Sequence, residues 1–497
     1  MPAPHVPPLR VRARNERPRA ARGAYVLYWM IAARRTGWNF ALDRAIELGQ
    51  ELRKPVLIFE ALRVGQRWNG ARHQRFVLDG LRANRDACRA AGVGYFPYVE
   101  PEHGAGAGLL AALAHDAAAV VTDEFPGYFL PRMVEAAARQ LDARLESVDA
   151  NGLLPLRATE AAFPTAYAFR RFLQKNLRPH LATPPLADPL EAAARLGGPV
   201  EVPPAIARRW APAADALLEG DARRFAALPL DHGVPPVAKP GGSLAARAAL
   251  RAFVRHKLPR YAEERSDPSA DTASGFSPWL HFGHLSTHEV LAEIARHEAW
   301  KPERTALTAS GKKDGWWNLP PSAEAFLDEL VTWRELGYGF AYHRADAERY
   351  ESLPDWARAT LDEHARDPRA HVYSLEEFER ALTHDALWNA AQRQLVREGR
   401  IHNYLRMLWG KKILEWTPSP RAALEVLFEL NNRWALDGRD PNSTSGICWT
   451  LGRFDRPWGP VRPVFGTIRY MSSENTARKL DVKPYLARYA GEPAAAR

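Results

Sequence analysis

The chain has 497 residues, more than a single hydrophobic core usually organises, so two domains are expected. Hydrophobic residues make up 46% and charged residues 25%, which is typical of a soluble globular protein and excludes a low-complexity chain. The formal net charge of +10 favours a polyanionic partner such as nucleic acid, although a solvated arginine-rich surface gives the same charge.

Cysteine content and hydropathy indicate the cellular compartment of the protein. Cys88 and Cys448 are too few to predict a disulfide framework or a cysteine-based zinc site. The N-terminus lacks the apolar core of a signal peptide. No apolar run approaches the roughly 20 residues that cross a bilayer. We therefore expect a cytoplasmic protein without a membrane segment and without a metal site.

The N-terminal part of the chain alternates between strand and helix patterns. Residues 1–23 are rich in Pro and Arg and are expected to form a disordered basic arm. Short apolar runs that suit buried strands lie at 25–30, 56–59, 95–99, 118–122 and 145–148, with helical spacing at 39–52 and 71–91. This alternation predicts a Rossmann-like α/β domain with a parallel sheet over 24–164. No Gly-x-Gly-x-x-Gly motif follows the first strand, so a dinucleotide site of that type is not predicted.

The rest of the chain contains a proline-rich region followed by a region with helical periodicity. Residues 165–245 contain repeated prolines and are expected to form a long interdomain linker with short helices. From 246 to 485 nearly every segment has helical periodicity, which predicts an all-α domain, followed by a tail at 486–497. Twelve of the sixteen tryptophans lie at or after Trp279. Such indoles usually fill cores, but a redox protein also needs them for electron transfer.

Two segments of the helical half have polar residues at helix starts or within helices. Residues 274–283 place small polar residues before Pro278, a pattern that caps a helix and can also hold a phosphate. Residues 326–336 mix acids, an Arg and a Trp, with Glu329 and Trp333 four residues apart on one helical face. The alternative for residues 274–283 is that they only cap a helix. The alternative for residues 326–336 is an amphipathic helix whose charges are solvated.

Two later segments combine aromatic and polar residues. Trp409 and Trp416 lie seven residues apart, and Trp388 lies 21 residues before Trp409 on the preceding predicted helix. Three such indoles form either a core stripe or a chain that leads from a buried redox centre. Residues 430–443 are a dense polar run that suits a ligand-lined loop or a solvated surface loop.

Together these segments resemble the photolyase–cryptochrome family, and most closely the class II cyclobutane pyrimidine dimer photolyases. The resemblance covers roughly residues 255–475 and is carried by Leu-Trp-Asn-Ala-Ala-Gln at 387–392, Gly-Lys-Lys-Ile-Leu-Glu-Trp-Thr-Pro at 410–418, Leu-Asp-Gly-Arg-Asp-Pro-Asn at 436–442 and Val-Phe-Gly-Thr-Ile-Arg-Tyr-Met at 464–471. It implies an α/β antenna domain, a linker and a helical domain that binds FAD. The chain departs from class II at Asn403 and Ser443, which implies a divergent branch.

The resemblance also assigns roles to residues. The residues implied to bind FAD are Tyr261, Ser274, Gly275, Ser277, Arg406, Asn431 and Asp437. Asn431 is implied to face the reactive edge of the isoalloxazine, where an amide can donate and accept. The residues implied to contact the lesion are Glu329, Trp333, Asn403, Met407 and Trp449, with the two indoles as walls that sandwich flipped bases.

The implied activity is light-driven repair of cyclobutane dimers in UV-damaged DNA by an electron from FADH⁻. Trp409 and Trp388, with Trp416 as a third member, are implied to reduce oxidised flavin. Asn403 and Met407 stand where (6-4) enzymes carry His, which favours cyclobutane dimers. An antenna such as 8-hydroxy-deazaflavin is implied in the N-terminal domain, and the protein is expected to be a monomer. A cryptochrome without repair activity and a non-enzymatic DNA-binding protein are the alternatives.

Overall fold

The N-terminal domain is built on one six-stranded sheet. The computed structural model describes residues 5–491, so residues 1–4 of the predicted arm and 492–497 of the predicted tail lie outside the described residues. The strands are β1 (Val11–Ala13), β2 (Tyr25–Met30), β3 (Val56–Leu62), β4 (Gly94–Val99), β5 (Ala117–Glu124) and β6 (Leu145–Asp149). Their order is β1-β6-β5-β2-β3-β4, and every pair is parallel except β1 with β6.

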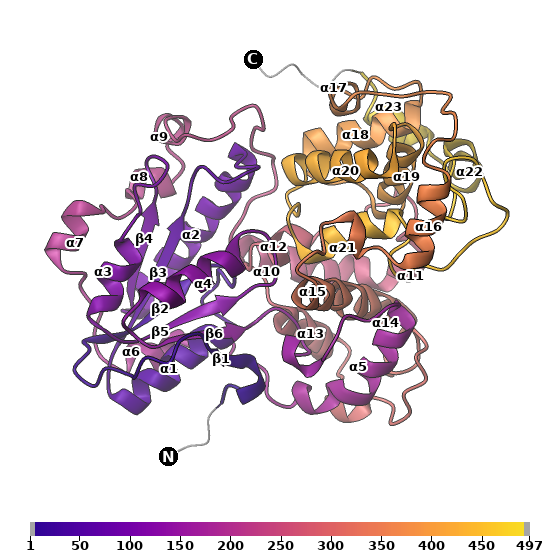
Figure 1. Cartoon of the computed structure of the whole chain (residues 1–497). Helices are drawn as coiled ribbons and strands as arrows, with labels where there is room; N and C mark the ends of the chain where they lie inside the picture. Colours follow the sequence, from indigo (N-terminus) through magenta and orange to yellow (C-terminus); the bar gives the residue numbers. More distant parts are fainter. Residues whose placement is uncertain (1–4, 492–497) are drawn as a thin grey trace.

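Helices cover both faces of this sheet (Figure 1). They are α1 (Phe40–Leu52), α2 (Ala71–Ala91), α3 (Leu109–His115) and α4 (Leu130–Gln140). Val26 and Tyr28 of β2 share a core with α1, whereas Leu27 and Trp29 share a core with α3 and α4. Because both faces are covered, β2 is apolar throughout and β3 and β5 begin as apolar runs, which is why the sequence pattern locates them well.

The segment expected to be a disordered arm is ordered from residue 5 onward, so that expectation is wrong for the described residues. Val11 to Ala13 pair antiparallel with β6 as an edge strand. Arg10 is 1% exposed and donates to the carbonyls of Gly152 and Leu153. Backbone pairing and a buried guanidinium thus hold a segment whose composition alone predicts disorder.

The helical half lies beside the sheet domain (Figure 1). Its main helices are α10 (Ser243–Ala252), α12 (Ser277–His281), α13 (Thr287–His297), α14 (Pro321–Leu327), η6 (Asp328–Trp333), α15 (Arg334–His343), α16 (Asp355–Glu363), α18 (Ala386–Glu398), α19 (Asn403–Glu415), α20 (Pro420–Trp434) and α21 (Pro441–Thr450). Glu335 of α15 accepts the backbone N–H groups of Leu153 and Leu154 across the domain boundary. The predicted fold class, α/β plus all-α, is confirmed.

The first part of the linker is not the short helix that was expected. Helix α5 (Ala166–Leu181) has 16 residues and is capped by Thr165. It packs in the helical half, where Arg170 forms an ion pair of 2.7 Å with Asp328 (Figure 1). The linker then returns to the sheet domain with α7 (Pro204–Arg209), α8 (Asp215–Leu218) and α9 (Ala222–Ala226).

Candidate active site

Five polar side chains from α19, α20, α21 and the loop between α20 and α21 meet in one cluster. Arg406 donates to Asn431 Oδ1 and, at 2.5 Å, to Ser443 Oγ, and its Nη1 lies 3.6 Å from Asp437. Asn431 Nδ2 donates to Ser443 Oγ and to Asn432 Oδ1, both at 2.9 Å. The structure therefore brings together Arg406, Asn431 and Asp437, which sequence reasoning had grouped, and adds Ser443 and Asn432.

This polar cluster is open on one side. Asn431 and Ser443 are buried, whereas 24% of the Arg406 side chain and 13% of the Asp437 side chain are exposed. A buried amide fixed by a guanidinium has a defined orientation, because its donor and acceptor atoms are already assigned. Such a cluster can present a cation, an acid and an oriented amide to a flat polar ligand.

Glu329 lies on η6 and is paired within the protein. Its carboxylate accepts from Arg265 Nη1 at 2.7 Å, and 30% of its side chain is exposed. Burial raises the pKa of Glu329, and the Arg265 guanidinium opposes the shift. The expectation that Glu329 and Trp333 share an α-helical face needs correction, because Asp328–Trp333 is a π-helix with a wider turn. π-Turns of this kind are frequent at functional sites.

Trp333 and Trp449 form one stacked pair rather than two opposing walls. Their ring centroids are 4.9 Å apart and the ring planes meet at 26°. No base fits between rings in van der Waals contact, so the expected sandwich is wrong for this arrangement. Both indoles are half-buried, and the pair can offer a ring face to a ligand.

The first turn of α19 carries the other two residues expected at the lesion. Asn403 is exposed and Met407, one turn further on, is half-buried. Arg406 stands between them and belongs to the polar cluster. One helix therefore supplies both the expected lesion contacts and the cation of the cluster.

The three tryptophans expected to act in series are in contact. Trp388 and Trp409 stack with centroids 6.5 Å apart and planes at 6°, and Trp416 meets the Trp388 ring edge-on at 6.0 Å. All three are buried. Trp409 follows Arg406 by three residues on α19, so this stack begins beside the polar cluster.

The segment expected to hold a phosphate lies beside a cation that sequence reasoning missed. Ser274 and Gly275 are half-buried and Ser277 is exposed. Lys239 Nζ lies 3.4 Å from the Gly275 carbonyl and 4.1 Å from the Trp279 ring centroid. Burial, with Arg400 and Lys257 nearby, lowers the pKa of Lys239 to about 8. Its position in a proline-rich linker offered no motif to find it.

Tyr261, expected on the adenine side of the flavin, lies one helical turn before Arg265 and is 8% exposed. Its ring packs edge-on against Phe326 at 5.4 Å and against Phe253 at 6.0 Å. The donor set suits FAD: a lysine without a carboxylate partner among residues 5–491 suits a diphosphate, and the oriented amide of Asn431 suits an isoalloxazine edge.

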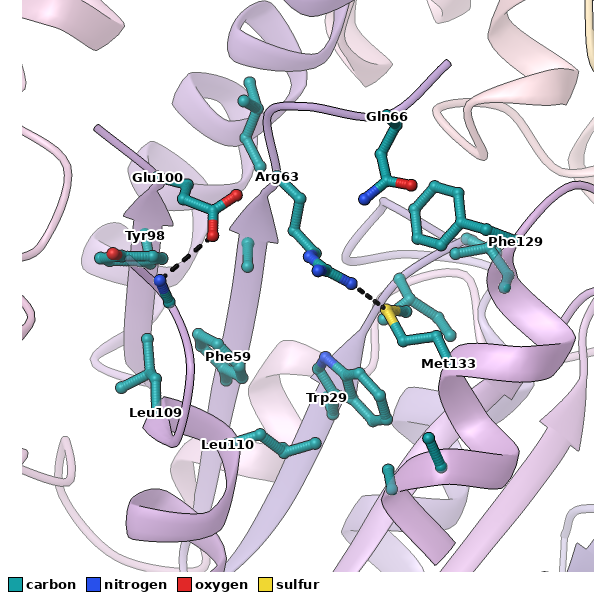
Figure 2. A pocket seen from close by; sticks show the side chains of 18 of the residues that line it. Trp29, Phe59, Arg63, Gln66, Tyr98, Glu100, Leu109, Leu110, Phe129 and Met133 are labelled. Atoms are coloured by element: carbon teal, nitrogen blue, oxygen red, sulfur yellow. Dashed lines mark hydrogen bonds between the residues drawn. The ribbon is translucent and has the colours of Figure 1, made fainter. Parts of the chain in front are cut away.

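A cavity of about 680 Å³ lies in the sheet domain at the carboxyl ends of β2 and β3 (Figure 2). The strand order reverses between β2 and β5, and ligands of open parallel sheets bind at such a switch point. Its aromatic lining residues are Trp29, Phe59, Tyr98, Phe125, Tyr128, Phe129 and Phe282. His281, Phe282 and Arg439 complete it from the helical half. Sequence reasoning assigned no residue to this cavity.

Comparison with known proteins identifies the family and the fold. The family model for DNA photolyase matches residues 26–192. A deoxyribodipyrimidine photo-lyase of Methanothermobacter thermautotrophicus is 34% identical over 97% of this chain and 98% of its own length. The chain belongs to the DNA photolyase family. A relative of the same name from Potorous tridactylus is 32% identical over 92% of this chain and 80% of its own.

Solved structures share the photolyase fold over nearly the whole chain. A class III photolyase from Agrobacterium tumefaciens superposes with a TM-score of 0.68 at 18% identity, covering 94% of this chain and 86% of that chain. A cryptochrome from Synechocystis gives 0.63 at 16% identity, covering 94% and 88%. The predicted family and fold are confirmed, while assignment to class II stays a prediction. Among residues 5–491, no helix is long and apolar enough to span a bilayer.

Proposed function

We propose that this photolyase-family chain binds FAD among its C-terminal helices and uses light to split cyclobutane pyrimidine dimers in DNA. The observation that carries the proposal is the partly exposed polar cluster of Arg406, Asn431 and Asp437, whose arginine lies three residues before Trp409 of the Trp388–Trp409 stack on α19. Its relatives with 31–34% identity over nearly the whole chain are named deoxyribodipyrimidine photo-lyase.

The residues that would hold FAD follow from the site and the family resemblance. Ser274, Gly275 and Ser277 would contact the diphosphate, and Lys239 would neutralise its charge. Tyr261 would lie toward the adenine. Asn431, oriented by Arg406, would present its amide to the isoalloxazine edge. When bound, reduced FAD supplies the light-excited electron that opens the cyclobutane ring and then returns, so the reaction is a lyase reaction.

The lesion must leave the duplex to reach this site, because a base inside the stack cannot approach a flavin held among helices, and photolyases are among the enzymes that flip their target out. The Trp333–Trp449 pair would stack on the extruded bases, at roughly 1–3 kcal/mol per base. Glu329 would hydrogen-bond the dimer, and Arg265 keeps its carboxylate in place. Asn403 and Met407 would contact the lesion from α19. DNA backbone contacts would carry most of the affinity, so sequence preference is expected to be low.

The buried indoles would serve a separate purpose. Trp409, Trp388 and Trp416 form a continuous ring path that starts beside Arg406. Trp388 Nε1 donates to the Trp409 carbonyl and Trp409 Nε1 to Gln392, so both rings are fixed. We infer that this path carries an electron toward oxidised flavin and restores the reduced form.

The cavity in the sheet domain would hold an antenna chromophore. Its volume of about 680 Å³ and its aromatic walls suit a planar tricyclic ligand such as 8-hydroxy-deazaflavin. Light absorbed there would be passed on to the helical domain.

The deciding experiment is a light-dependent repair assay. FAD-loaded, prereduced protein is mixed with an oligonucleotide carrying one thymine dimer and illuminated with blue light, and a dark sample is kept in parallel. We expect dimer loss in light alone. Glu329→Gln should reduce repair, whereas Glu263→Gln, an exposed acid on the neighbouring helix, should not. Binding of flavin and damaged DNA without any dimer loss in light would overturn the proposal and favour a signalling flavoprotein.

A further inference from the structure

The path of three stacked indoles ends before it reaches solvent. Trp416, the last of the three, is only 3% exposed. A path that delivers electrons repeatedly must be refilled by a reductant in solution, and such a reductant makes close contact only with exposed groups. The path therefore needs one more redox-active side chain between Trp416 and the surface.

Tyr373 occupies that position. Its ring meets the Trp416 ring edge-on with centroids 5.7 Å apart, and its backbone N–H donates to the Trp416 carbonyl at 3.0 Å. This ring contact is as close as that between Trp388 and Trp416, at 6.0 Å. The Tyr373 side chain is half-buried, whereas both indoles are buried. One further ring contact thus leads from the core to the surface.

A histidine is placed to accept the phenolic proton of Tyr373. The Tyr373 hydroxyl meets His384 Nδ1 at 2.7 Å, and the His384 backbone N–H donates to the same hydroxyl oxygen at 3.0 Å. Because that N–H is a donor only, the phenolic proton is directed to the imidazole. A phenol that loses an electron becomes a strong acid, so its oxidation is favoured where a base lies within roughly 2.6–3.2 Å of the oxygen.

The surroundings of His384 keep its imidazole available as a base. Partial burial and the stacked ring of His371, at 3.9 Å between centroids, lower the pKa of His384. Lys412 also lowers this pKa, whereas Asp385 and Glu415 oppose the shift. The imidazole is therefore neutral near pH 7 and can accept a proton. The His384 side chain is exposed, so an accepted proton can pass on to water.

A second tyrosine near this end of the path lacks such a base. Tyr470 is 36% exposed, and Lys412 Nζ lies 5.7 Å from its ring centroid and 5.4 Å from that of Trp416. No residue between 5 and 491 accepts a hydrogen bond from the Tyr470 hydroxyl. Exposure is thus shared by the two tyrosines, whereas the hydrogen-bonded base belongs to Tyr373 alone among them.

We infer that Tyr373 is the terminal electron donor of the indole path and that His384 takes up its proton. The inference rests on the proposed photoreduction of FAD and adds these two residues to it. An electron passes from Tyr373 to oxidised Trp416, the phenolic O–H bond breaks, and the proton moves to His384 Nδ1. The products are a reduced indole, a neutral tyrosyl radical and an imidazolium. A thiolate in solution then gives one electron to the radical, becoming a thiyl radical, and the imidazolium returns the proton.

Electron paramagnetic resonance of illuminated protein loaded with oxidised FAD tests the inference. The wild type should yield a neutral tyrosyl radical. Tyr373→Phe, which removes only the hydroxyl, should lose that signal and leave a tryptophan radical in its place. Tyr470→Phe is the matched control and should keep the wild-type signal.

The role of His384 has a separate readout, the rate of tyrosyl formation after a light flash. In the wild type this rate should fall as the pH falls through the lowered pKa of His384, because an imidazolium cannot accept a proton. His384→Gln keeps a hydrogen-bond acceptor but no base, so it should slow the step by about a hundredfold and abolish this pH dependence. A histidine that served only packing would give neither effect.

A Tyr373→Phe protein that binds FAD and still yields the full tyrosyl signal would overturn the inference, as would loss of the signal in Tyr470→Phe alone. A wild type that yields only tryptophan radicals, or a rate with the same pH dependence in His384→Gln, would also contradict it. Dimer repair by prereduced wild type needs no refilling of the path. Its failure would therefore refute the proposed repair activity and leave the radical measurements unaffected.

Discussion

The helical domain contains two stacked indole pairs that differ in their surroundings. Trp388 and Trp409 are 0% and 2% exposed, and both ring N–H groups donate to fixed protein acceptors. Trp333 and Trp449 stack more closely, at 4.9 Å, but both are half-buried. Two stacked pairs therefore suit different roles. A buried pair with fixed rings suits electron transfer, and a half-buried pair suits stacking on a ligand.

The largest expected difference between the two pairs appears when one indole of the buried pair is removed. Trp409→Phe should abolish most of the light-driven reduction of bound oxidised FAD, since it interrupts the ring path between Arg406 and Trp388. Repair by prereduced enzyme should stay near the wild-type level. The flavin absorption spectrum under illumination measures the first effect. Trp434→Phe, at another buried indole bonded to Glu379, is the control. Unchanged photoreduction in Trp409→Phe would contradict the assigned path.

The two pairs should also differ in how much they contribute to the free energy of unfolding. Trp388→Ala leaves a large cavity in a dry core and should lower the free energy of unfolding by about 3–5 kcal/mol. Trp449→Ala removes a half-exposed ring and should lower it by about 1 kcal/mol. Denaturant unfolding of the FAD-loaded proteins measures both. Equal losses in the two variants would mean that burial does not distinguish the pairs.

Lys411 is adjacent to both indole pairs. Its titration should make the free energy of unfolding depend on pH. It follows Trp409 on α19, is 1% exposed, and donates to the Thr450 carbonyl next to Trp449. Burial lowers the pKa of Lys411 to about 7. Above that pH the unfolded chain keeps a proton that the folded protein has released, so folding becomes more favourable as pH rises toward the ordinary lysine pKa.

The stability gain attributable to Lys411 should therefore be about 2 kcal/mol between about pH 7 and about pH 9, and Lys411→Met should lose it. Unfolding of wild type and variant at both pH values measures the difference. Lys412→Met is the matched control, because its ion pair with Glu415 raises the pKa of Lys412 and leaves it protonated throughout. A wild type and a Lys411→Met protein with parallel pH profiles would show that Lys411 does not titrate in this range.

The sequence patterns predict these features unequally, for physical reasons. The five parallel strands and α2 are located well, because buried parallel strands are rich in apolar residues and α2 has a clear helical period, whereas the edge strand β1 was not predicted. Trp388 and Trp409 are predicted together because their helices are neighbours in the chain. Trp333 and Trp449 lie on distant segments, and no spacing rule reports whether two such rings face or touch.

The two buried or half-buried cations escaped prediction for a related reason. Lys239 and Arg439 acquire their roles only when the linker and a tight turn approach other elements in space. Asn431, Arg406 and Asp437 were found through family motifs, but Ser443, the partner of Arg406 and Asn431, was noted only as a departure from the class II pattern. In the structure its hydroxyl bonds both Arg406 and Asn431, so the departure falls inside the cluster.

The last prediction tests the open pair directly. Trp449→Ala should weaken binding of dimer-containing oligonucleotide by about 1–3 kcal/mol, and binding of undamaged duplex by much less, since only an extruded lesion reaches the ring face. Fluorescence anisotropy in the dark, at one fixed salt concentration, measures both affinities. Trp356→Ala, at another half-buried indole of the helical half, controls for general loss of packing. If Trp449→Ala weakens both oligonucleotides equally, the pair contacts the DNA backbone region and does not recognise the lesion.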